Sequence, residues 1–418
     1  MKNIAFAKIG KSVKFRTNKY SPIGGDNEAS CVLRALANNN PDKKFYIIGR
    51  SDFSTLTENE VIDLFPYGNV IDVWENVGLD ISDEYFRHII NYFDRNSIDI
   101  DFCVMMVGQV GSVTIPNKIK KVRDLDDVNF ASVLDMTKWY VTPISTWLNE
   151  VKPRYVEIVN DPRYTMKQSR DLFHLPEISL GQYDYTYKTN AITSYEDQTR
   201  IERNVKSIYA GMETAFCGDY DYEYSKDFNL DRKTNFMVVL NEGKPSRYDM
   251  LNEWVLEHFR DVNIYGKWED ERTKVDSRFK GSRHIYDIQR MLSDVKYTFI
   301  IPIAKGWVTS KYIEMIHAGV IPFFHPTYDE QGHTRVPDFF RPQTPEELRK
   351  RIDILNADEN LYRESITKLR HLILKQSYYD GTFISQTILS AMNSEYALPD
   401  LSQYQKKEKA RGLEDFFS

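Results

Sequence analysis

Cysteine is scarce in this chain. Only three of its 418 residues are cysteine, Cys31, Cys103 and Cys217, and no two of them are spaced as Cys-x-x-Cys. Disulfide-stapled scaffolds need several cysteines, and cysteine zinc sites need closely spaced pairs, so both classes are excluded. The fold must depend on hydrophobic cores, for which 41% hydrophobic and 13% aromatic residues are sufficient.

Long apolar runs are also absent. No segment approaches the roughly 18 consecutive apolar residues of a transmembrane helix. The apolar run that follows Met1 is too short for a secretory signal. We therefore expect a soluble, cytoplasmic protein with no membrane partner.

The chain lacks an overall positive charge, since its formal net charge is −6. Any contact with nucleic acid must then come from local patches. Two such patches exist, one before Asp26, the first acidic residue, and one at residues 118–123. Both suit a phosphate backbone, although a merely solvated basic face is the alternative. The first patch consists of Lys2, Lys8, Lys11, Lys14, Arg16 and Lys19.

Short, nearly continuous apolar runs alternate with helical patterns in two successive series. This is typical of parallel sheets that are covered on both faces. The first series comprises strands expected at 4–9, 44–48, 70–74, 102–107, 139–142 and 155–159, with helices near 27–37 and 83–93. The second comprises strands expected at 235–241, 262–265, 297–303 and 320–324. The pattern predicts an α/β protein with two doubly wound, Rossmann-like domains that face each other across a cleft.

The domain boundaries follow from changes in composition. We expect a first domain over 1–190, a polar connecting segment over 191–234 with a helix near 196–214, and a second domain over 235–380. Thr344 followed by Pro345 predicts a helix start in the second domain. A helix over 381–404 is expected to cross back to the first domain, and a tail occupies 405–418.

The most informative stretch covers residues 300–324. It predicts a buried strand, a turn, a short helix that carries Glu314, a stop at Gly319 and a second buried strand. A carboxylate at the strand-to-helix edge can accept hydrogen bonds from both hydroxyls of a ribose. The alternative is an ordinary strand-helix-strand unit whose glutamate faces solvent.

The order Glu314, Gly319, Ile321-Pro322 resembles the sugar-nucleotide half of GT-B glycosyltransferases. The resemblance implies a UDP-sugar as donor substrate, no tightly bound cofactor, and no metal for donor binding. Many members carry a second glutamate where this chain has Gly306.

Cations are expected at the donor diphosphate, where negative charge develops as the glycosidic bond breaks. Lys244 and Arg247 follow the first strand of the second domain and are the candidates, with charges on a surface loop as the alternative. Thr309, Ser310 and Lys311 begin the Glu314 helix and are expected at the same phosphates.

The acceptor side is expected in the first domain. Gly24 and Gly25 follow the first strand and let a ligand approach the backbone closely, unless they form a plain turn. Another strand ends in Asn160-Asp161, followed by Arg163. The carboxylate of Asp161 can take the proton of an acceptor hydroxyl, although Asp-Pro is also common in turns.

Residues 155–172 and 312–324 resemble segments of the T-even bacteriophage DNA α-glucosyltransferases. These enzymes transfer a sugar to 5-hydroxymethylcytosine in viral DNA. The resemblance implies that Asp161 is catalytic and that the partner is double-stranded DNA with a hydroxymethylated pyrimidine, in the host cytoplasm. Glucose and arabinose are both open as the sugar. Where the family has histidine before its aspartate, this chain has Asn160.

The C-terminal segment contains Leu413, Phe416 and Phe417 on an otherwise polar tail. Their spacing resembles the peptide that docks on DNA sliding clamps, although the usual glutamine is replaced by Ala410. The alternative is that these side chains dock on the protein itself.

Two rival functions remain open from the sequence. One is a bacterial GT-B enzyme that builds a surface polysaccharide, which would need neither the basic patches nor the apolar tail. The other is a degenerate GT-B fold that binds DNA without catalysis.

Overall fold

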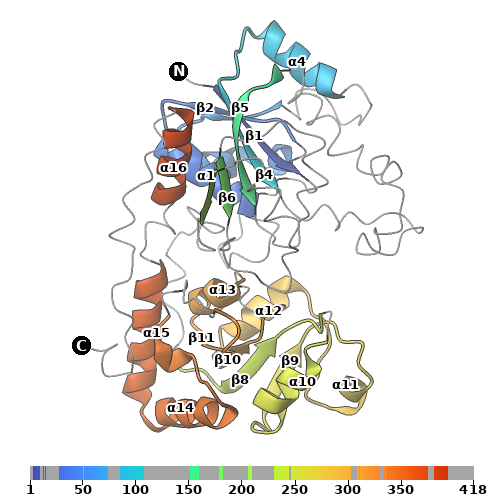
Figure 1. Cartoon of the computed structure of the whole chain (residues 1–418), viewed down its shortest axis with the longest axis vertical. Helices are drawn as coiled ribbons and strands as arrows, with labels where there is room; N and C mark the ends of the chain where they lie inside the picture. Colours follow the sequence, from blue (N-terminus) through green and yellow to red (C-terminus); the bar gives the residue numbers. More distant parts are fainter. Residues whose placement is uncertain are drawn as a thin grey trace. The chain divides into compact units, whose positions relative to one another are not determined.

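The computed structural model describes residues 3–9, 13, 15, 28–49, 51–73, 85–107, 151–159, 178–181, 206–209, 230–243, 246–302, 308–309, 311–329, 334, 336–374 and 381–393. These residues form two compact units (Figure 1). Of these described residues, those numbered 3 to 209 and 381 to 393 belong to the first unit, and those numbered 230 to 374 belong to the second. Among the described helices, none combines the length and the apolar character that a membrane crossing requires.

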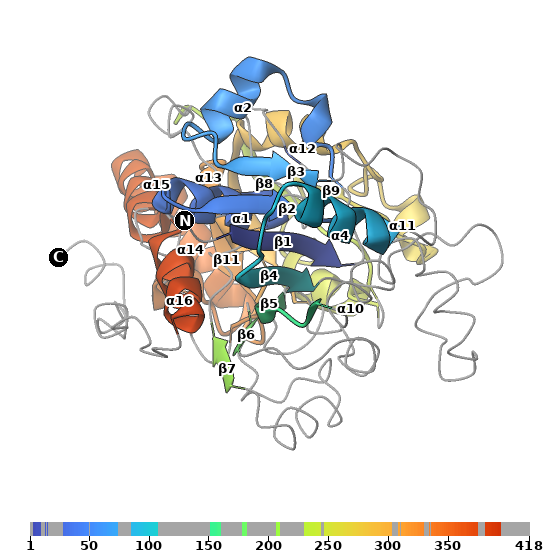
Figure 2. The ribbon, with the colours of Figure 1, turned by 90° about the horizontal axis from the view of Figure 1, so that it is seen from above.

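The first unit contains a seven-stranded parallel sheet in the order β3-β2-β1-β4-β5-β6-β7 (Figure 2). Its central strands are buried apolar runs, as predicted, because helices cover both faces of such a sheet. The strands are β1 (Asn3–Ile9), β2 (Lys44–Ile47), β3 (Val70–Asp72), β4 (Phe102–Val107), β5 (Arg154–Val159), β6 (Ile178–Gly181) and β7 (Lys206–Tyr209).

Strand β7 corrects one prediction. We expected a helix near 196–214, whereas residues 206–209 extend the sheet beside β6, with Leu180 opposite Ile208. The lysine and serine that open this strand hide its β character, while Ile208 and Tyr209 are residues that favour strands. The strand expected at 139–142 lies outside the described residues.

Helix α16 (Thr382–Met392) packs against α1 (Glu28–Asn39), although the two are far apart in the chain (Figure 1). The buried Asn40 side chain donates to Ser385 Oγ at 2.8 Å. Arg154 donates to the carbonyl of Met392 at 2.9 Å. The unit also contains α2 (Glu58–Leu64), α4 (Tyr85–Arg95) and a 3₁₀ turn at Phe53–Thr55.

The second unit contains a four-stranded parallel sheet in the order β11-β10-β8-β9. Its strands are β8 (Thr234–Val239), β9 (Val262–Tyr265), β10 (Val295–Ile300) and β11 (Ile321–Phe324). The aromatic side chain of Trp254 stacks on Phe299 of β10 with ring centroids 5.2 Å apart.

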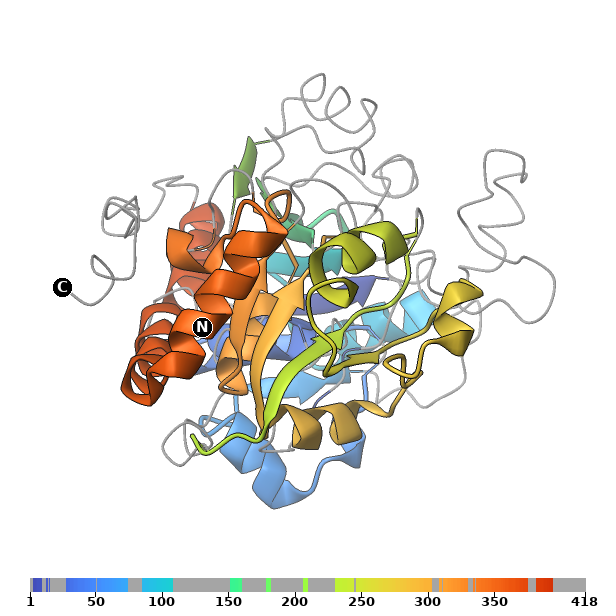
Figure 3. The same ribbon diagram turned by 90° about the horizontal axis from the view of Figure 1, so that it is seen from below.

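Several helices surround this sheet (Figure 3). As predicted, Thr344 caps α14, its hydroxyl accepting from the backbone N–H of Glu347, with proline in the first turn. The elements are α10 (Tyr248–Leu251), a π-helical segment (Asn252–Leu256), α11 (Arg272–Val275), α12 (Ile285–Leu292), α13 (Lys311–His317), a 3₁₀ turn (Asp338–Phe340), α14 (Pro345–Ala357) and α15 (Glu359–Leu374).

Each sheet has one point where the direction of strand addition reverses. In the first unit the chain adds β2 and β3 on one side of β1, then β4 on the other. In the second it adds β9 on one side of β8, then β10 on the other. Ligands of open α/β sheets bind outside the carboxyl ends of the strands at such points. The loops after β8 and β10 therefore define the candidate site of the second unit.

Candidate functional site

Arg247 ties together the two loops at the switch point of the second unit. Its side chain is buried, and its guanidinium donates to the carbonyls of Asn241, Glu242 (3.2 Å) and Ile301 (3.1 Å). Asn241 and Glu242 follow β8, and Ile301 follows β10. One planar fork thus fixes the relative position of both strand ends.

Burial lowers the pKa of Arg247 to about 10. The guanidinium therefore stays protonated at neutral pH and supplies a fixed positive charge at the switch point. Gly243 makes this position possible, because it has φ +77° and a Cβ there would lie 3.2 Å from Arg247 Nε. The neighbouring candidate Lys244 lies outside the described residues.

The loop after β10 leads to Lys311 and Glu314 on α13. Glu314 is only 3% exposed, so the alternative of a solvent-facing glutamate is wrong. Its Oε2 accepts from Lys311 Nζ at 2.6 Å, and the Lys311 side chain is 32% exposed. The carboxylate is thus held within the fold beside a cation that reaches the surface.

A residue that the sequence did not indicate, Tyr328, positions the end of this loop, just before α13. Its buried hydroxyl accepts from the backbone N–H of Thr309 at 3.0 Å and donates to the Thr309 carbonyl at 2.6 Å. Thr309 Oγ1 lies 3.3 Å from the same oxygen. Burial raises the pKa of Tyr328, so the hydroxyl keeps its proton for the carbonyl. Ser310, expected beside Thr309, lies outside the described residues.

A buried charged network supports the segment that carries Tyr328. The carboxylate of Asp329 accepts from Arg341, from the Thr334 backbone N–H at 2.9 Å and from the Thr334 hydroxyl at 2.7 Å. Arg341 also lies over the ring of Phe324, 5.3 Å from its centroid. Tyr328 in turn packs on Phe324, with ring centroids 5.0 Å apart. The loop after β11 is thereby anchored from both sides.

One predicted surface cation is in fact buried. Lys8, assigned from the sequence to an exposed basic patch, is 3% exposed within β1. The strand alternates its side chains between two covered faces, which a count of charges cannot reveal. The other cations of that patch and residues 118–123 lie outside the described residues.

The acceptor and tail candidates also lie outside the described residues. These are Gly24, Gly25, Asn160, Asp161, Arg163, Leu413, Phe416 and Phe417. Strand β5 ends at Val159, so it runs up to the Asn160-Asp161 pair as predicted. Across the described part of the chain, no cluster of three or more histidine, cysteine, aspartate or glutamate side chains could hold a metal ion.

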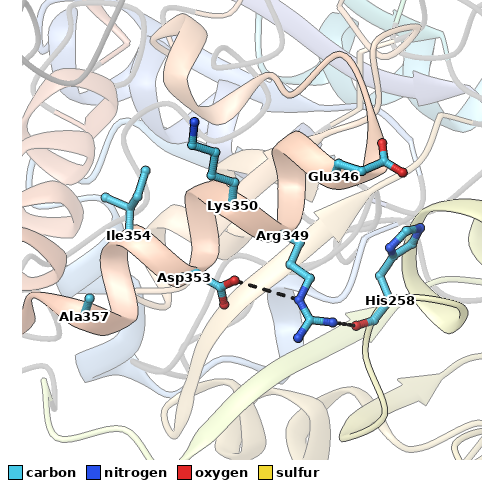
Figure 4. A pocket seen from close by; sticks show the side chains of 7 residues that line it. All are labelled: His258, Glu346, Arg349, Lys350, Asp353, Ile354 and Ala357. Carbon is cyan, nitrogen blue, oxygen red and sulfur yellow. Dashed lines mark hydrogen bonds and ion pairs between the residues drawn. The ribbon is translucent and has the colours of Figure 1, made fainter.

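A separate surface hollow lies along α14 (Figure 4). Arg349 donates to the carbonyl of His258 at 2.7 Å and lies 3.8 Å from Asp353. His258 precedes β9, so this hollow lies by the amino ends of the strands and away from the switch point. It is not part of the candidate site.

No family model matches the chain, and no curated protein matches it in sequence. Solved structures do match along nearly the whole length. A substituted T4 phage β-glucosyltransferase in complex with UDP-glucose has 11% identity and a TM-score of 0.52, covering 96% of this chain and 100% of its own. The chain has the GT-B fold.

Two further solved structures also match. The DNA-modifying enzyme β-glucosyltransferase, solved with and without uridine diphosphoglucose, has 11% identity and a TM-score of 0.55, covering 94% of this chain and 99% of its own. HepE from Anabaena, in complex with UDP and glucose, has 12% identity and a TM-score of 0.49, covering 94% and 100%. The phage neighbours are β-glucosyltransferases, so the resemblance to the α-glucosyltransferases is not confirmed.

Proposed function

We propose that this protein is a phage-type DNA glycosyltransferase. It would move a sugar from a UDP-sugar to the hydroxymethyl group of 5-hydroxymethylcytosine in DNA. The observation that carries the proposal is the match over 96% of the chain to a T4 phage β-glucosyltransferase bound to UDP-glucose. The buried carboxylate and the buried guanidinium at the switch point of the second unit support it.

The donor would bind at the loops after β8 and β10. Glu314 accepts hydrogen bonds from the ribose hydroxyls, because a carboxylate can accept several at once. Arg247 contributes a fixed charge near the diphosphate while it holds the loops in place. Lys311 and Lys244 are the further candidate cations for the phosphates, with Thr309 and Ser310 as candidate hydrogen-bond donors at the start of the Glu314 helix.

In the reaction, the acceptor oxygen forms a bond to the anomeric carbon of the sugar. The bond from that carbon to the diphosphate oxygen breaks, and UDP leaves with the electron pair. The proton of the acceptor hydroxyl must pass to a base, for which Asp161 is the candidate. The cytosine would reach the donor after flipping out of the duplex.

The test combines the protein with a panel of UDP-sugars and DNA that contains 5-hydroxymethylcytosine. Digestion to nucleosides and mass spectrometry should show one added sugar per modified base. A Glu314→Ala variant is the control and should add none. Transfer to a glycan acceptor but not to DNA would contradict the proposal and favour the polysaccharide enzyme.

We also propose that Leu413, Phe416 and Phe417 bind a DNA sliding clamp. Three large apolar side chains on a polar tail need a partner surface, and the spacing suits an apolar pocket. Deletion of residues 412–418 should abolish clamp binding in a pull-down while turnover on free oligonucleotides stays unchanged. Equal clamp binding by both forms would remove this assignment.

A further inference from the structure

A basic segment borders the second sheet along its edge strand β9. We name residues 278–284 the edge strip. Its backbone is fastened to β9, since Lys280 N–H donates to the Ile264 carbonyl at 2.8 Å and Gly266 N–H donates to the Gly281 carbonyl at 3.1 Å. The strip therefore pairs with the sheet as an additional parallel segment, and the backbone that carries its side chains is held in place.

The edge strip carries two exposed cations that have no ion pair or side-chain hydrogen bond with any residue that the structure describes. These are Lys280 and Arg283. By contrast, Arg278 is engaged by Asp276 at 2.7 Å and by the Leu256 carbonyl at 2.6 Å. No acidic residue occurs between Asp276 and Asp287. Lys280 does attract the Asp276 carboxylate electrostatically, but neither Lys280 nor Arg283 is held in an ion pair among the described residues. Exposed cations on a fixed backbone are suited to an anionic partner.

The backbone between these cations is open. Gly281 has φ +71°, and a Cβ there would meet nothing within 4 Å. Ser282, the next residue, is small and exposed. An anion can therefore approach the main chain between Lys280 and Arg283. Their Cα atoms can be at most about 10 Å apart, since an extended chain spans about 3.3–3.6 Å per residue.

The edge strip lies at the carboxyl end of the sheet, as do the loops after β8 and β10 that form the candidate donor site. A Cβ on Gly266 would lie 2.0 Å from the Leu240 carbonyl, so the end of β9 is in close contact with the start of the loop after β8. Adjacent strands are about 4.8 Å apart, which places the strip roughly 10 Å from β8 in the plane of the sheet. A polymer bound there would run past the candidate site.

We propose that the edge strip, through Lys280 and Arg283, binds the phosphate backbone of the DNA acceptor beside the donor site. The choice of DNA as the polyanion rests on the proposed function. The contacts are to phosphates, so they hold the duplex in position without selecting a base sequence.

The test measures the affinity of a fluorescent duplex containing 5-hydroxymethylcytosine at several salt concentrations between 50 and 200 mM. Each phosphate contact contributes about 0.9 to the slope of log affinity against log salt. The double variant Lys280→Ser/Arg283→Ser should therefore lower the slope by about 2 and leave UDP binding unchanged. The control is Arg260→Ser/Lys350→Ser, which removes two other exposed cations of the same unit and should keep the wild-type slope.

Equal slopes for the two double variants would overturn the edge-strip proposal, whether both fall or both stay at the wild-type value. So would a wild-type protein that does not bind DNA. The proposed function is judged separately by UDP titration and by sugar transfer with the wild-type protein. If the Lys280→Ser/Arg283→Ser variant still transfers sugar to DNA and keeps the wild-type salt slope, the proposed function stands and the edge-strip proposal is rejected.

Discussion

Both units contain a parallel sheet with helices, but they fix the ends of these helices and strands with different side chains. In the first unit, Arg154 joins β5 to the end of α16, but neutral amides also link helix and strand ends, as where Asn69 donates to the carbonyls of Ala37 (3.0 Å) and Asn40 (3.2 Å). In the second unit, buried arginines do this. Arg232 donates to the carbonyls of Leu292, Val295 and Ala318 at 2.7–2.8 Å, and Arg247 and Arg341 act similarly.

Buried arginines allow a small sheet to present rigid loops. An amide offers two donors, whereas a guanidinium offers five in a planar fork, so one arginine can join three segments. Among the described residues, the second sheet has four strands against seven in the first, and therefore fewer neighbouring strands to support its loops. We infer that its candidate site is largely formed before a ligand arrives.

The largest effect is expected from Arg247→Ala. Removal of the fork leaves buried carbonyls without their donor, and the free energy of unfolding should fall by about 3–5 kcal/mol. Denaturant titration measures this loss, and calorimetry should show that UDP binding is lost as well. Arg232→Ala is the matched control, because it should destabilise the fold without a specific effect on UDP. If Arg247→Ala binds UDP as tightly as the wild type, Arg247 does not contribute to donor binding.

The second effect is acid destabilisation through His325, which follows β11. Burial lowers its pKa to about 4, and Nδ1 accepts from the Thr327 backbone N–H at 3.2 Å. Because the folded protein favours the neutral form of His325, this residue adds to the free energy of unfolding, and the full contribution is present above pH about 6.5. That contribution, about 3 kcal/mol, is lost as the pH falls to about 4. His325→Asn keeps an acceptor but cannot titrate there, so its unfolding free energy should vary less between pH 6.5 and 4.

The third effect concerns Glu314→Gln. The amide keeps the shape of the side chain but loses the charge that attracts Lys311 and strengthens hydrogen bonds from a diol. Calorimetric titration should show affinity for both uridine and UDP falling by roughly 10- to 100-fold, or about 1.4–2.7 kcal/mol. If uridine binds the variant as tightly as the wild type, the ribose is held elsewhere.

The smallest effect is expected from Tyr328→Phe, at about 1 kcal/mol. Loss of the hydroxyl loosens Thr309, so the KM for the UDP-sugar should rise several-fold with little change in kcat. Tyr362→Phe is the matched control, because its buried hydroxyl has no hydrogen-bond partner among the described residues. Equal KM values for the two variants would show that the Tyr328 contact does not position the donor loop.

The sequence predicts β4 and β9 at the residues they occupy, β4 as a buried apolar run and β9 through its alternation of buried Val262 and Ile264 with half-buried Asn263 and Tyr265. It fails at β7, where polar residues open the strand. The site was harder to predict, because the sequence shows Arg247 as a cation but not that its donors are taken up by carbonyls. Tyr328 could not be found, because it contacts Thr309 from 19 residues away without any repeating pattern.

The bond between Asn40 and Ser385 joins residues 345 positions apart. At about 5–20 residues per second, a ribosome needs roughly 20–70 seconds to extend the nascent chain from one to the other. During that interval the apolar side of α1 has no α16 to cover it. The first unit is thus begun first and completed last, and we expect the uncovered side of α1 to be a surface that a chaperone would shield during synthesis.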